Sequence, residues 1–359
     1  MTRAVIDRPL LVVVGSGGVG KTTLAAALGL SAARAGKHTL VMTFDPSLRL
    51  KDALGVGEGT RDREVAVRVD TPGRLAVSLL DARAAFDRLV VEYSPDADAA
   101  GRILDNRFYR HLAGGLAGIL EYMAVERLFE VTAARRYDRI VLDTPPTRQA
   151  LDFLEAPDRV VGFLESGALG IALRPWFDER GRLRAGVGPV RRGLEDLLDR
   201  VVGLDLLREI AEFFQAFAPL YEGFRRRAAE VRKLLRAPET LFLLVAGPGE
   251  ERIPDTLFFA RRLREQGHHL GPIVVNQTHS LLPVDSADPR LIGHMGEGLR
   301  LLAWLGERDA RGLAELRGLL GRDQRLVDLP FLAEPPTDLR SLEALGRQFH
   351  ERLAASAAG

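Results

Sequence analysis

Residues 10–23 read LLVVVGSGGVGKTT, an apolar run followed by a glycine-rich turn and the pair Lys21-Thr22. The segment fits the pattern G-x-x-x-x-G-K-[ST], which binds phosphate when a buried strand precedes it and a helix follows it. Glycine lets successive backbone N–H groups point inward around phosphate oxygens, and the positive end of the following helix adds to the attraction. The helical pattern of 22–35 supplies that helix. The stretch therefore predicts a strand, a phosphate-binding loop and a helix in this order.

Each residue type in the loop has an expected task. Lys21 would reach the β- and γ-phosphates of a nucleotide, and the Thr22 hydroxyl would bind Mg²⁺. The residues expected to cradle the phosphates are Gly17, Gly18, Val19, Gly20, Lys21, Thr22 and Thr23. The alternative is a glycine-rich turn that only joins a strand to a helix. Lysine occurs at just four positions of the chain, so a lysine at this one favours the phosphate loop.

The bulk composition fits one large domain or two tightly joined ones. The chain has 359 residues, of which 46% are hydrophobic, so it can bury a sizeable core. Its 50 basic and 49 acidic residues leave a net charge of +1. That balance gives no general attraction to nucleic acid or to an acidic membrane. We therefore expect no nucleic-acid partner and no stable membrane insertion.

The sequence lacks cysteine and long apolar stretches, and these two absences exclude several kinds of site and segment. The chain has no cysteine, which excludes disulfides, thiolate metal sites, iron–sulfur clusters and cysteine nucleophiles. No stretch reaches the roughly 18 apolar residues that a bilayer-spanning helix needs. The run LLVVV is also too short for the apolar part of a signal peptide. These absences predict a cytoplasmic protein.

Short apolar runs alternate with longer helical patterns along the chain. The runs typical of strands buried on both faces are Leu10–Val14, Thr39–Phe44, Leu75–Leu79, Arg139–Leu142, Leu241–Val245 and Ile273–Val275. Helical patterns between them include 22–35, 115–134 and 254–266. This alternation predicts an α/β fold with a doubly wound, mostly parallel sheet. Ligands of such folds bind at the carboxyl ends of the strands.

One region interrupts the alternation. From about 160 to 235 the sequence has helical patterns and no convincing strand. We interpret it as a helical insertion subdomain within a single P-loop ATPase domain that covers 1–359. The sequence has no internal repeat, so the chain carries one nucleotide-binding half rather than a tandem pair.

Two strands are followed by candidate catalytic carboxylates. Ile140–Asp143 has the form of a Walker B motif, whose acid holds Mg²⁺ through water, although a strand ending in Asp is commonplace. The rigid turn Thr144–Thr147 follows it, where a sensor of the γ-phosphate is expected. Asp45 follows the strand 39–44 and could orient or deprotonate the attacking water. The alternative for Asp45 is an Asp-Pro turn without a catalytic role.

Together these motifs resemble the ArsA/GET family of deviant Walker A ATPases, within the SIMIBI class of P-loop NTPases that includes MinD, ParA and the nitrogenase iron protein. Residues 45–52, DPSLRLKD, are similar to the first switch segment of the family, DPAHSLSD. Residues 143–151, DTPPTRQAL, are similar to its second switch segment, DTAPTGHTL. Residues 274–277, VVNQ, match the strand end whose Asn reads adenine, and residues 329–331, LPF, resemble the loop that lines the base. The resemblance covers nearly the whole chain.

The resemblance implies an ATPase that uses ATP and Mg²⁺ and dimerises across its nucleotides. Hydrolysis would open and close the helical subdomain, which takes the place where the family binds a client. The implied site residues are Lys21, Asp45 and Asp143 for catalysis, Thr22, Asp45 and Asp143 for the metal, and Asn276, Pro330 and Phe331 for the base.

The chain departs from the family at Ser16. The family pattern is GKGGVGKT, in which the early Lys reaches the phosphates of the neighbouring subunit, whereas this chain has GSGGVGKT. Either another cation replaces that Lys, with Arg49, Lys51 and Arg148 as candidates, or a paralogous ATPase carrying the Lys supplies it in a heterodimer. The lack of cysteine also excludes the thiolate arsenite sensor and the cysteine zinc clasp that some members of the family have.

A group of apolar residues in the helical region has two interpretations. Near-helical spacing relates Phe213, Phe214, Phe217, Leu220, Tyr221 and Phe224. The group could line a groove for an apolar helical protein client, such as a tail anchor. It could instead pack on the core or on a dimer partner, and this second interpretation is the favoured one. For the final helix, 339–353, packing on the domain is likewise favoured over membrane binding.

The leading hypothesis is an ATP-hydrolysing dimer that couples nucleotide state to binding of a protein client or partner. One alternative is a regulatory half that binds ATP and hydrolyses it poorly. A second is a positioning ATPase like ParA or MinD, against which the missing basic face and terminal anchor count. A third is a kinase of small molecules, for which the sequence offers no acceptor-site signature.

Overall fold

The computed structural model describes residues 7–44, 54, 63–107, 109–110, 119–145, 150–151, 153–156, 158, 213, 220–282, 289–321 and 323–356. The chain divides into two compact units. The first consists of Met1–Leu80, Ala134–Leu151 and Leu234–Gly359, and the second of Asp81–Ala133 and Asp152–Lys233.

The first unit is built on a sheet whose strand order, in the described residues, is β3-β4-β2-β5-β1-β6-β7-β8. The strands are β1 (Leu10–Gly15), β2 (His38–Thr43), β3 (Glu64–Val67), β4 (Arg74–Leu79), β5 (Arg139–Asp143), β6 (Thr240–Ala246), β7 (Leu270–Thr278) and β8 (Leu326–Pro330). Neighbouring strands run parallel, except that β3 and β4 are antiparallel. The predicted doubly wound, mostly parallel α/β sheet is confirmed. Sequence reasoning missed β3 and β8.

Burial of both sheet faces explains why the apolar runs form the central strands. Every residue of β1, β5 and β6 is buried, which a parallel strand covered on both faces requires. Because β1 lies between β5 and β6, the loop that follows it emerges at the middle of the carboxyl edge. This is where α/β folds bind ligands.

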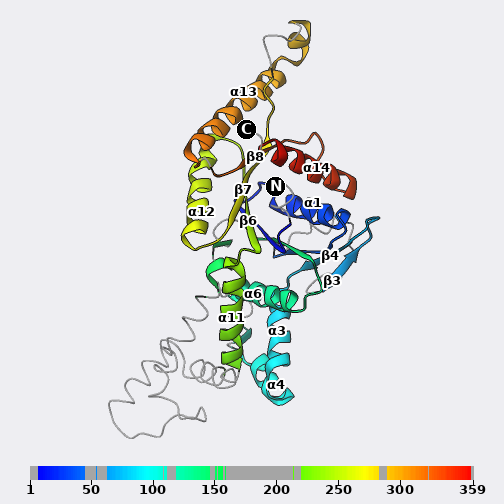
Figure 1. The fold of residues 1–359 in the computed structure, drawn as a ribbon, viewed down its shortest axis with the longest axis vertical. Coiled ribbons are helices and arrows are strands. Elements are labelled where there is room, and N and C mark those ends of the chain that lie inside the picture. The colour runs from blue at the N-terminus through cyan, green and yellow to red at the C-terminus, as the bar shows by residue number, and fades with distance from the viewer. Residues whose placement is uncertain are drawn as a thin grey trace, which may run out of the picture. The chain divides into compact units, whose positions relative to one another are not determined.

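Two helices cover one face of this sheet (Figure 1). The helix α1 (Lys21–Arg34) packs along α14 (Leu339–Ala355), and both share a core with alternate residues of the strands, among them Val13, Val245 and Val274. Their close approach uses Gly346, where a Cβ would lie 2.3 Å from Ser31 Oγ. The apolar face of α14 is buried, so the expectation that this helix packs on the domain is confirmed.

Two further helices pack against the other side of β7. The helix α12 (Ile253–Glu265) follows the short 3-10 turn η3 (Glu250–Arg252), and α13 (Pro289–Leu319) contacts both β7 and η3. Val275 faces this side, whereas its neighbour Val274 belongs to the core under α1 and α14. The alternation of side chains along β7 thus serves two separate packing layers.

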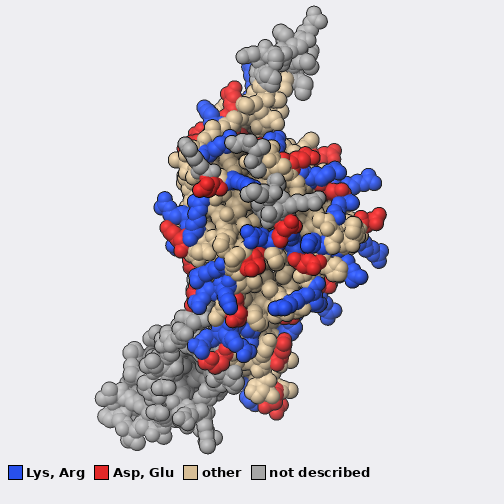
Figure 2. Space-filling view, in the orientation of Figure 1, with Lys and Arg blue, Asp and Glu red and all other residues tan. Residues whose placement is uncertain are grey.

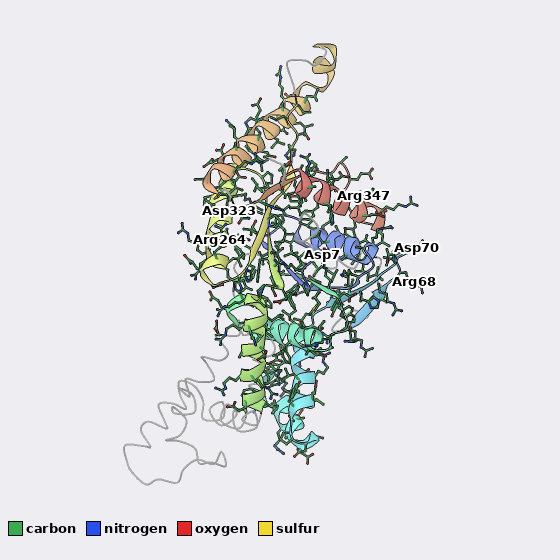
Figure 3. The ribbon with its side chains drawn as sticks, in the orientation of Figure 1. Asp7, Arg68, Asp70, Arg264, Asp323 and Arg347 are labelled. Atoms are coloured by element: carbon green, nitrogen blue, oxygen red, sulfur yellow. The ribbon has the colours of Figure 1, made fainter. Side chains whose placement is uncertain are left out.

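Charged residues mark the surface and the sheet edge. Arg68 and Asp70 follow the short edge strand β3 and lie beyond it in Figure 3. Short, charged edges discourage pairing with another chain. Basic and acidic side chains are intermixed on the face shown in Figure 2, in line with the small net charge.

Among the described residues no helix combines the length and the apolar content needed to cross a bilayer.

The described part of the second unit is helical. Its helices are α3 (Ala82–Tyr93), α4 (Ala97–Asp105), α6 (Ile119–Ala133) and α11 (Tyr221–Arg236), the last of which continues beyond this unit at Leu234. Most of the predicted insertion, 160–235, lies outside the described residues, as do Phe214 and Phe217.

Aromatic side chains form the centre of the second unit. Tyr122 stacks on Phe224 with ring centroids 5.3 Å apart, and Phe213 stacks on Tyr109 at 6.2 Å. Phe213, Leu220 and Phe224 are each at most 4% exposed. For these three residues the structure therefore supports core packing rather than an open groove.

Candidate nucleotide-binding site

The loop between β1 and α1 is shaped to receive an anion. Gly20 is the N-cap of α1 in a left-handed conformation, and no side chain caps the first turn of the helix. That turn also contains no acidic residue. The first backbone N–H groups of a helix have no partner within the helix, so they remain available to phosphate oxygens.

Lys21 supplies the positive charge of the loop. Its side chain is only 7% exposed, and its Nζ donates a 2.8 Å hydrogen bond to the carbonyl oxygen of Ser16. The ammonium group is therefore tied to the backbone of the loop itself.

A buried carboxylate at the end of β5 joins two hydroxyl groups. Asp143 is completely buried, and its Oδ2 accepts hydrogen bonds from Thr22 Oγ1 at 2.7 Å and from Thr43 Oγ1 at 2.8 Å. The structure thus brings together two residues predicted from separate motifs, Thr22 and Asp143. Thr43 was missed, because nothing in its local sequence shows that β2 pairs with β5.

The start of the second switch segment is fixed to β1. The backbone N–H and the hydroxyl of Thr144 both donate to the carbonyl oxygen of Val13, at 3.2 and 2.8 Å. Residues 146–149 that follow lie outside the described residues, and so do Asp45, Arg49 and Lys51. Their predicted roles stay predictions.

Asn276 connects the end of β7 to the loop. Its Nδ2 donates a 2.8 Å hydrogen bond to the carbonyl oxygen of Val19, and its side chain is buried. Gln277 follows with a positive φ of 66°, a conformation rare for a residue other than glycine. Gln277 lies inside β7, where the pairing with β8 shifts register between Asn276 and Thr278. This irregularity lies beside the loop, where the sequence predicts contact with a base.

An exposed aromatic ring lies at the end of β8. The Phe331 N–H donates to the Thr278 carbonyl oxygen at 2.8 Å, and its ring stacks on His279 with centroids 5.6 Å apart and planes 9° apart. Phe331 is 59% exposed, so one face of this aromatic pair is accessible. His279 was missed by sequence reasoning, which had no means to place it against Phe331.

The His279 ring is oriented by a buried carboxylate of α13. Asp309 Oδ2 lies 2.8 Å from His279 Nδ1 and accepts the His279 backbone N–H at 2.9 Å, while Arg308 donates to Oδ1. Burial raises the pKa of Asp309, but the hydrogen bonds from His279 and Arg308 outweigh it and hold the pKa below its usual value. Asp309 therefore stays ionised and fixes the imidazole ring.

Comparison with known proteins identifies the family of the chain. Residues 9–292 match the sequence profile of the ArsA ATPase family, whose description is anion-transporting ATPase. The match covers well over half of the chain. This chain belongs to that family. The expected membership of the ArsA/GET family is thereby confirmed, together with the P-loop α/β fold.

Individual relatives agree with this assignment. The protein SCO2128 of Streptomyces coelicolor is 30% identical over 334 residues, which are 90% of this chain and 75% of that protein. The ATPase get3 of Schizosaccharomyces japonicus is 25% identical over 337 residues, 92% of this chain and 88% of the relative. Protein Rv2184c of Mycobacterium tuberculosis is 34% identical over 197 residues, and the match spans only 44% of its length.

The donor atoms of this ArsA-family site suit Mg²⁺. This ion prefers oxygen ligands and keeps several waters, which one hydroxyl and one nearby carboxylate satisfy. Thr22, at the start of α1, and Asp143, at the end of β5, provide these groups. Among the described residues there is no group of three or more His, Cys, Asp or Glu side chains that could hold a metal ion, so the fit to Mg²⁺ rests on Thr22 and Asp143.

Substitutions at two loop glycines are expected to differ in effect. A Cβ at Gly20, whose φ is +85°, would lie 2.5 Å from Asn276 Nδ2, whereas at Gly18, whose φ is +76°, it meets nothing within 4 Å. Gly18→Ala should cost about 1 kcal/mol of stability from backbone strain alone. Gly20→Ala should cost a further ~1–3 kcal/mol, because it displaces the buried amide from the Val19 carbonyl oxygen. Urea unfolding of the two variants tests this, and equal midpoints would contradict it.

Proposed function

We propose that this ArsA-family protein binds ATP with Mg²⁺ at residues 15–22 and hydrolyses it to ADP and phosphate. The observation that carries the proposal is the convergence of Lys21, Thr22 and Asp143 on one loop, with bonds of 2.7–2.8 Å holding them in place. Family membership supports ATPase chemistry in general, and the get3 relative of Schizosaccharomyces japonicus is named an ATPase.

Binding of a triphosphate requires that Lys21 change its partner. In the proposal its Nζ leaves the Ser16 carbonyl oxygen and binds terminal phosphate oxygens, where a buried ammonium group stabilises developing charge. The helix end at Gly20 contributes backbone N–H groups to the same phosphates. The helix end is in place before the nucleotide arrives, so within the loop only the Lys21 side chain has to move.

Thr22 and Asp143 would organise the metal side of the site. Thr22 would bind Mg²⁺ directly, and Asp143 would act through bound water, since Oδ2 already accepts from Thr22 and Thr43. Mg²⁺ supplies charge neutralisation of the phosphate oxygens when it is bound. Asp45 is proposed to orient or deprotonate the attacking water, as the first switch segment implies.

The base would bind at the ends of β7 and β8. Asn276 offers an amide beside the loop, and Phe331 with Pro330 offers an accessible surface on which a purine ring can stack. If the protein works as the family resemblance implies, hydrolysis in a dimer would change the conformation of the helical subdomain and thereby its binding of a client or partner.

A second candidate function rests on Ser16. If a paralogue must supply the cation that Ser16 lacks, this chain alone would bind ATP and turn it over slowly, as the regulatory half of a heterodimer. The arrangement favouring this candidate is that Ser16 offers its carbonyl oxygen to Lys21 and no positive charge.

Phosphate release from ATP by the purified full chain, measured over a range of protein concentrations with and without Mg²⁺, tests the proposal. We expect Mg²⁺-dependent formation of ADP and phosphate in equal amounts. ATP binding without turnover, relieved by adding a Lys-bearing paralogue, would favour the regulatory half. Formation of ADP without free phosphate in the presence of a metabolite would favour a kinase, and absence of ATP binding would overturn the proposal.

A further inference from the structure

A triphosphate brings several negative charges to this site, and Lys21 is the only cation within the loop. The predicted replacements for the family's early lysine, Arg49, Lys51 and Arg148, lie outside the described residues. A different cation stands beside the loop in the part of the chain that is described. It is Arg252, at the end of η3, just after the carboxyl end of β6.

The position of Arg252 relative to the loop follows from Gly247. A Cβ placed at Gly247 would lie 3.5 Å from Val19 Cγ1 and 3.8 and 4.0 Å from Arg252 Cγ and Nε. The Arg252 side chain and Val19 of the phosphate loop therefore both lie close to Gly247. Since β6 pairs directly with β1, both segments also emerge at the same edge of the sheet.

The backbone of Arg252 is held rigidly. Its N–H donates to the Gly249 carbonyl oxygen at 3.2 Å, and its own carbonyl oxygen accepts from Thr256 Oγ1 at 2.8 Å. The neighbouring turn is pressed on α13, where a Cβ at Gly312 would lie 3.1 Å from the Gly249 carbonyl carbon. Because the backbone is fixed, only the side chain of Arg252 has to be ordered when it binds.

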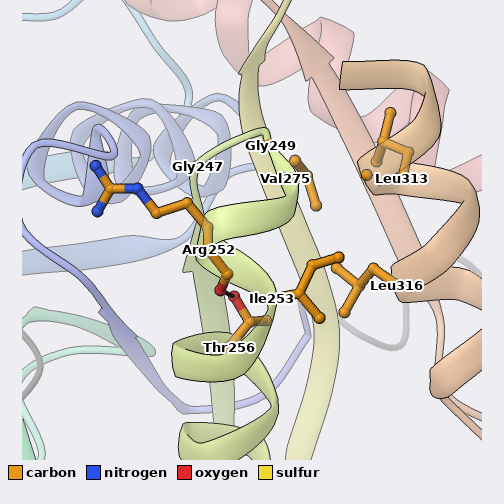
Figure 4. Close-up of a pocket in the computed structure, with 9 residues that line it drawn as sticks. Gly247, Gly249, Arg252, Ile253, Thr256, Val275, Leu313 and Leu316 are labelled. Carbon is orange, nitrogen blue, oxygen red and sulfur yellow. Dashed lines mark hydrogen bonds between the residues drawn. The ribbon is translucent and has the colours of Figure 1, made fainter. Parts of the chain in front are cut away.

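The small pocket behind Arg252 serves this anchoring and not a ligand. Apolar side chains of Ile253, Val275, Leu313 and Leu316 line it, and it has room for about one water molecule. Figure 4 shows the Arg252 side chain leaving the pocket, with its guanidinium end on the side away from Leu313 and Leu316. The pocket thus fixes the backbone while the charged end points outward.

The Arg252 residue is exposed. Within the described ranges no carboxylate forms an ion pair with Arg252, whereas Arg308 and Arg311 of the neighbouring helix each have an acidic partner. A guanidinium group presents a planar fork of N–H donors that matches phosphate oxygens.

We propose that Arg252 is a second phosphate-binding cation of this site, which binds the phosphate chain of ATP and provides the positive charge that Ser16 cannot. The inference rests on the proposed function and adds a residue to it. Lys21 enters from the loop and Arg252 from the end of β6, so the two charges contact the phosphates from different strands.

The test compares ATP binding and hydrolysis by the wild-type full chain with those of Arg252→Ala and of Arg261→Ala. Arg261 is an exposed arginine of α12 and serves as the matched control. Arg252→Ala should weaken Mg·ATP binding about tenfold to a hundredfold, which is the loss of affinity expected when one charge-assisted hydrogen bond is removed. Arg261→Ala should stay near wild type, and thermal unfolding without nucleotide should be the same for all three proteins.

A rescue experiment makes the assignment specific. Adding Ser16→Lys to Arg252→Ala should recover part of the lost affinity, because the new lysine enters the same loop. Wild-type ATP binding by Arg252→Ala would overturn the inference and leave the proposed function standing. Failure of the wild-type chain itself to bind ATP would overturn the proposed function, so the two outcomes are distinguishable.

Discussion

Replacing Lys21 with alanine is expected to reduce ATP hydrolysis by about 100- to 1000-fold, the size of effect seen when a preorganised electrostatic group is removed from a reaction site. The buried Nζ of Lys21 is the one loop cation that faces the phosphates in the proposed mechanism, and alanine leaves nothing in its place. Steady-state phosphate release measures the effect on hydrolysis, and equilibrium ATP binding, measured on the same preparation, shows how much of it comes from weaker binding.

Lys37→Ala is the matched control for this prediction. Lys37 is exposed and lies beyond the other end of α1, far along the helix from the loop. Its replacement should leave hydrolysis unchanged. Lys21→Met retains much of the side-chain stem and separates loss of charge from loss of packing. Hydrolysis by Lys21→Ala at the wild-type rate would contradict the assigned role of the loop.

Replacing Glu126 with alanine is expected to lower the free energy of unfolding by about 3–5 kcal/mol. Glu126 on α6 and Arg227 on α11 form an ion pair of 2.7 Å in which both side chains are at least 93% buried, at 7% and 3% exposure. Tyr122 donates a hydrogen bond to the other carboxylate oxygen, and Arg227 also lies 4.1 Å over the ring of Tyr93. Removing only the acid leaves a buried guanidinium charge without its counter-ion.

The controls separate the cost of a lone charge from the value of the pair. Glu126→Leu combined with Arg227→Met should destabilise much less than Glu126→Ala, since neither buried charge remains. The exposed pair of Glu222 and Arg225 on α11, 3.1 Å apart, serves as the surface control, and Glu222→Ala should cost less than about 1 kcal/mol. Equal costs for Glu126→Ala and Glu222→Ala in thermal or urea unfolding would contradict the prediction.

The pH dependence of the same site has a defined sign. Burial raises the pKa of Glu126 by more than Arg227 and the Tyr122 hydroxyl lower it. The folded protein therefore binds this proton more readily than the unfolded chain, whose glutamate pKa is about 4.3. The associated stability is present below that value and is lost as the pH rises through the raised folded pKa. Glu126→Gln should remove this part of the change in the free energy of unfolding with pH. Unfolding midpoints of the wild type and the variant, measured from acid to neutral pH, test this.

Local sequence was sufficient for the centre of the fold. The strand β1, the loop after it and the helix α1 are encoded in consecutive residues, so their pattern could be recognised without tertiary information. The strands β3 and β8 were missed because the segments EVAV and LVDLP are short, and pairing with β4 and β7 stabilises them. Their strand character depends on neighbours distant in sequence.

The same distinction applies to the site. Thr22, Asp143 and Asn276 belong to recognisable motifs, whereas Thr43, His279 and Arg252 have no local signal. Thr43 reaches Asp143 only through pairing of β2 with β5, and Arg252 flanks the loop only because β6 lies beside β1. A sequence pattern identifies residues of the loop itself, and topology supplies the residues around it.

A structure of the chain with Mg²⁺ and a non-hydrolysable ATP analogue will show directly whether residues 15–22 bind the nucleotide. We expect the phosphates within residues 15–22, with Lys21 Nζ moved from the Ser16 carbonyl oxygen to the phosphates. We expect the metal beside Thr22 and Asp143 and the base between Asn276 and Phe331. An analogue bound at saturation outside this loop, with Lys21 still bonded to Ser16, would contradict this expectation.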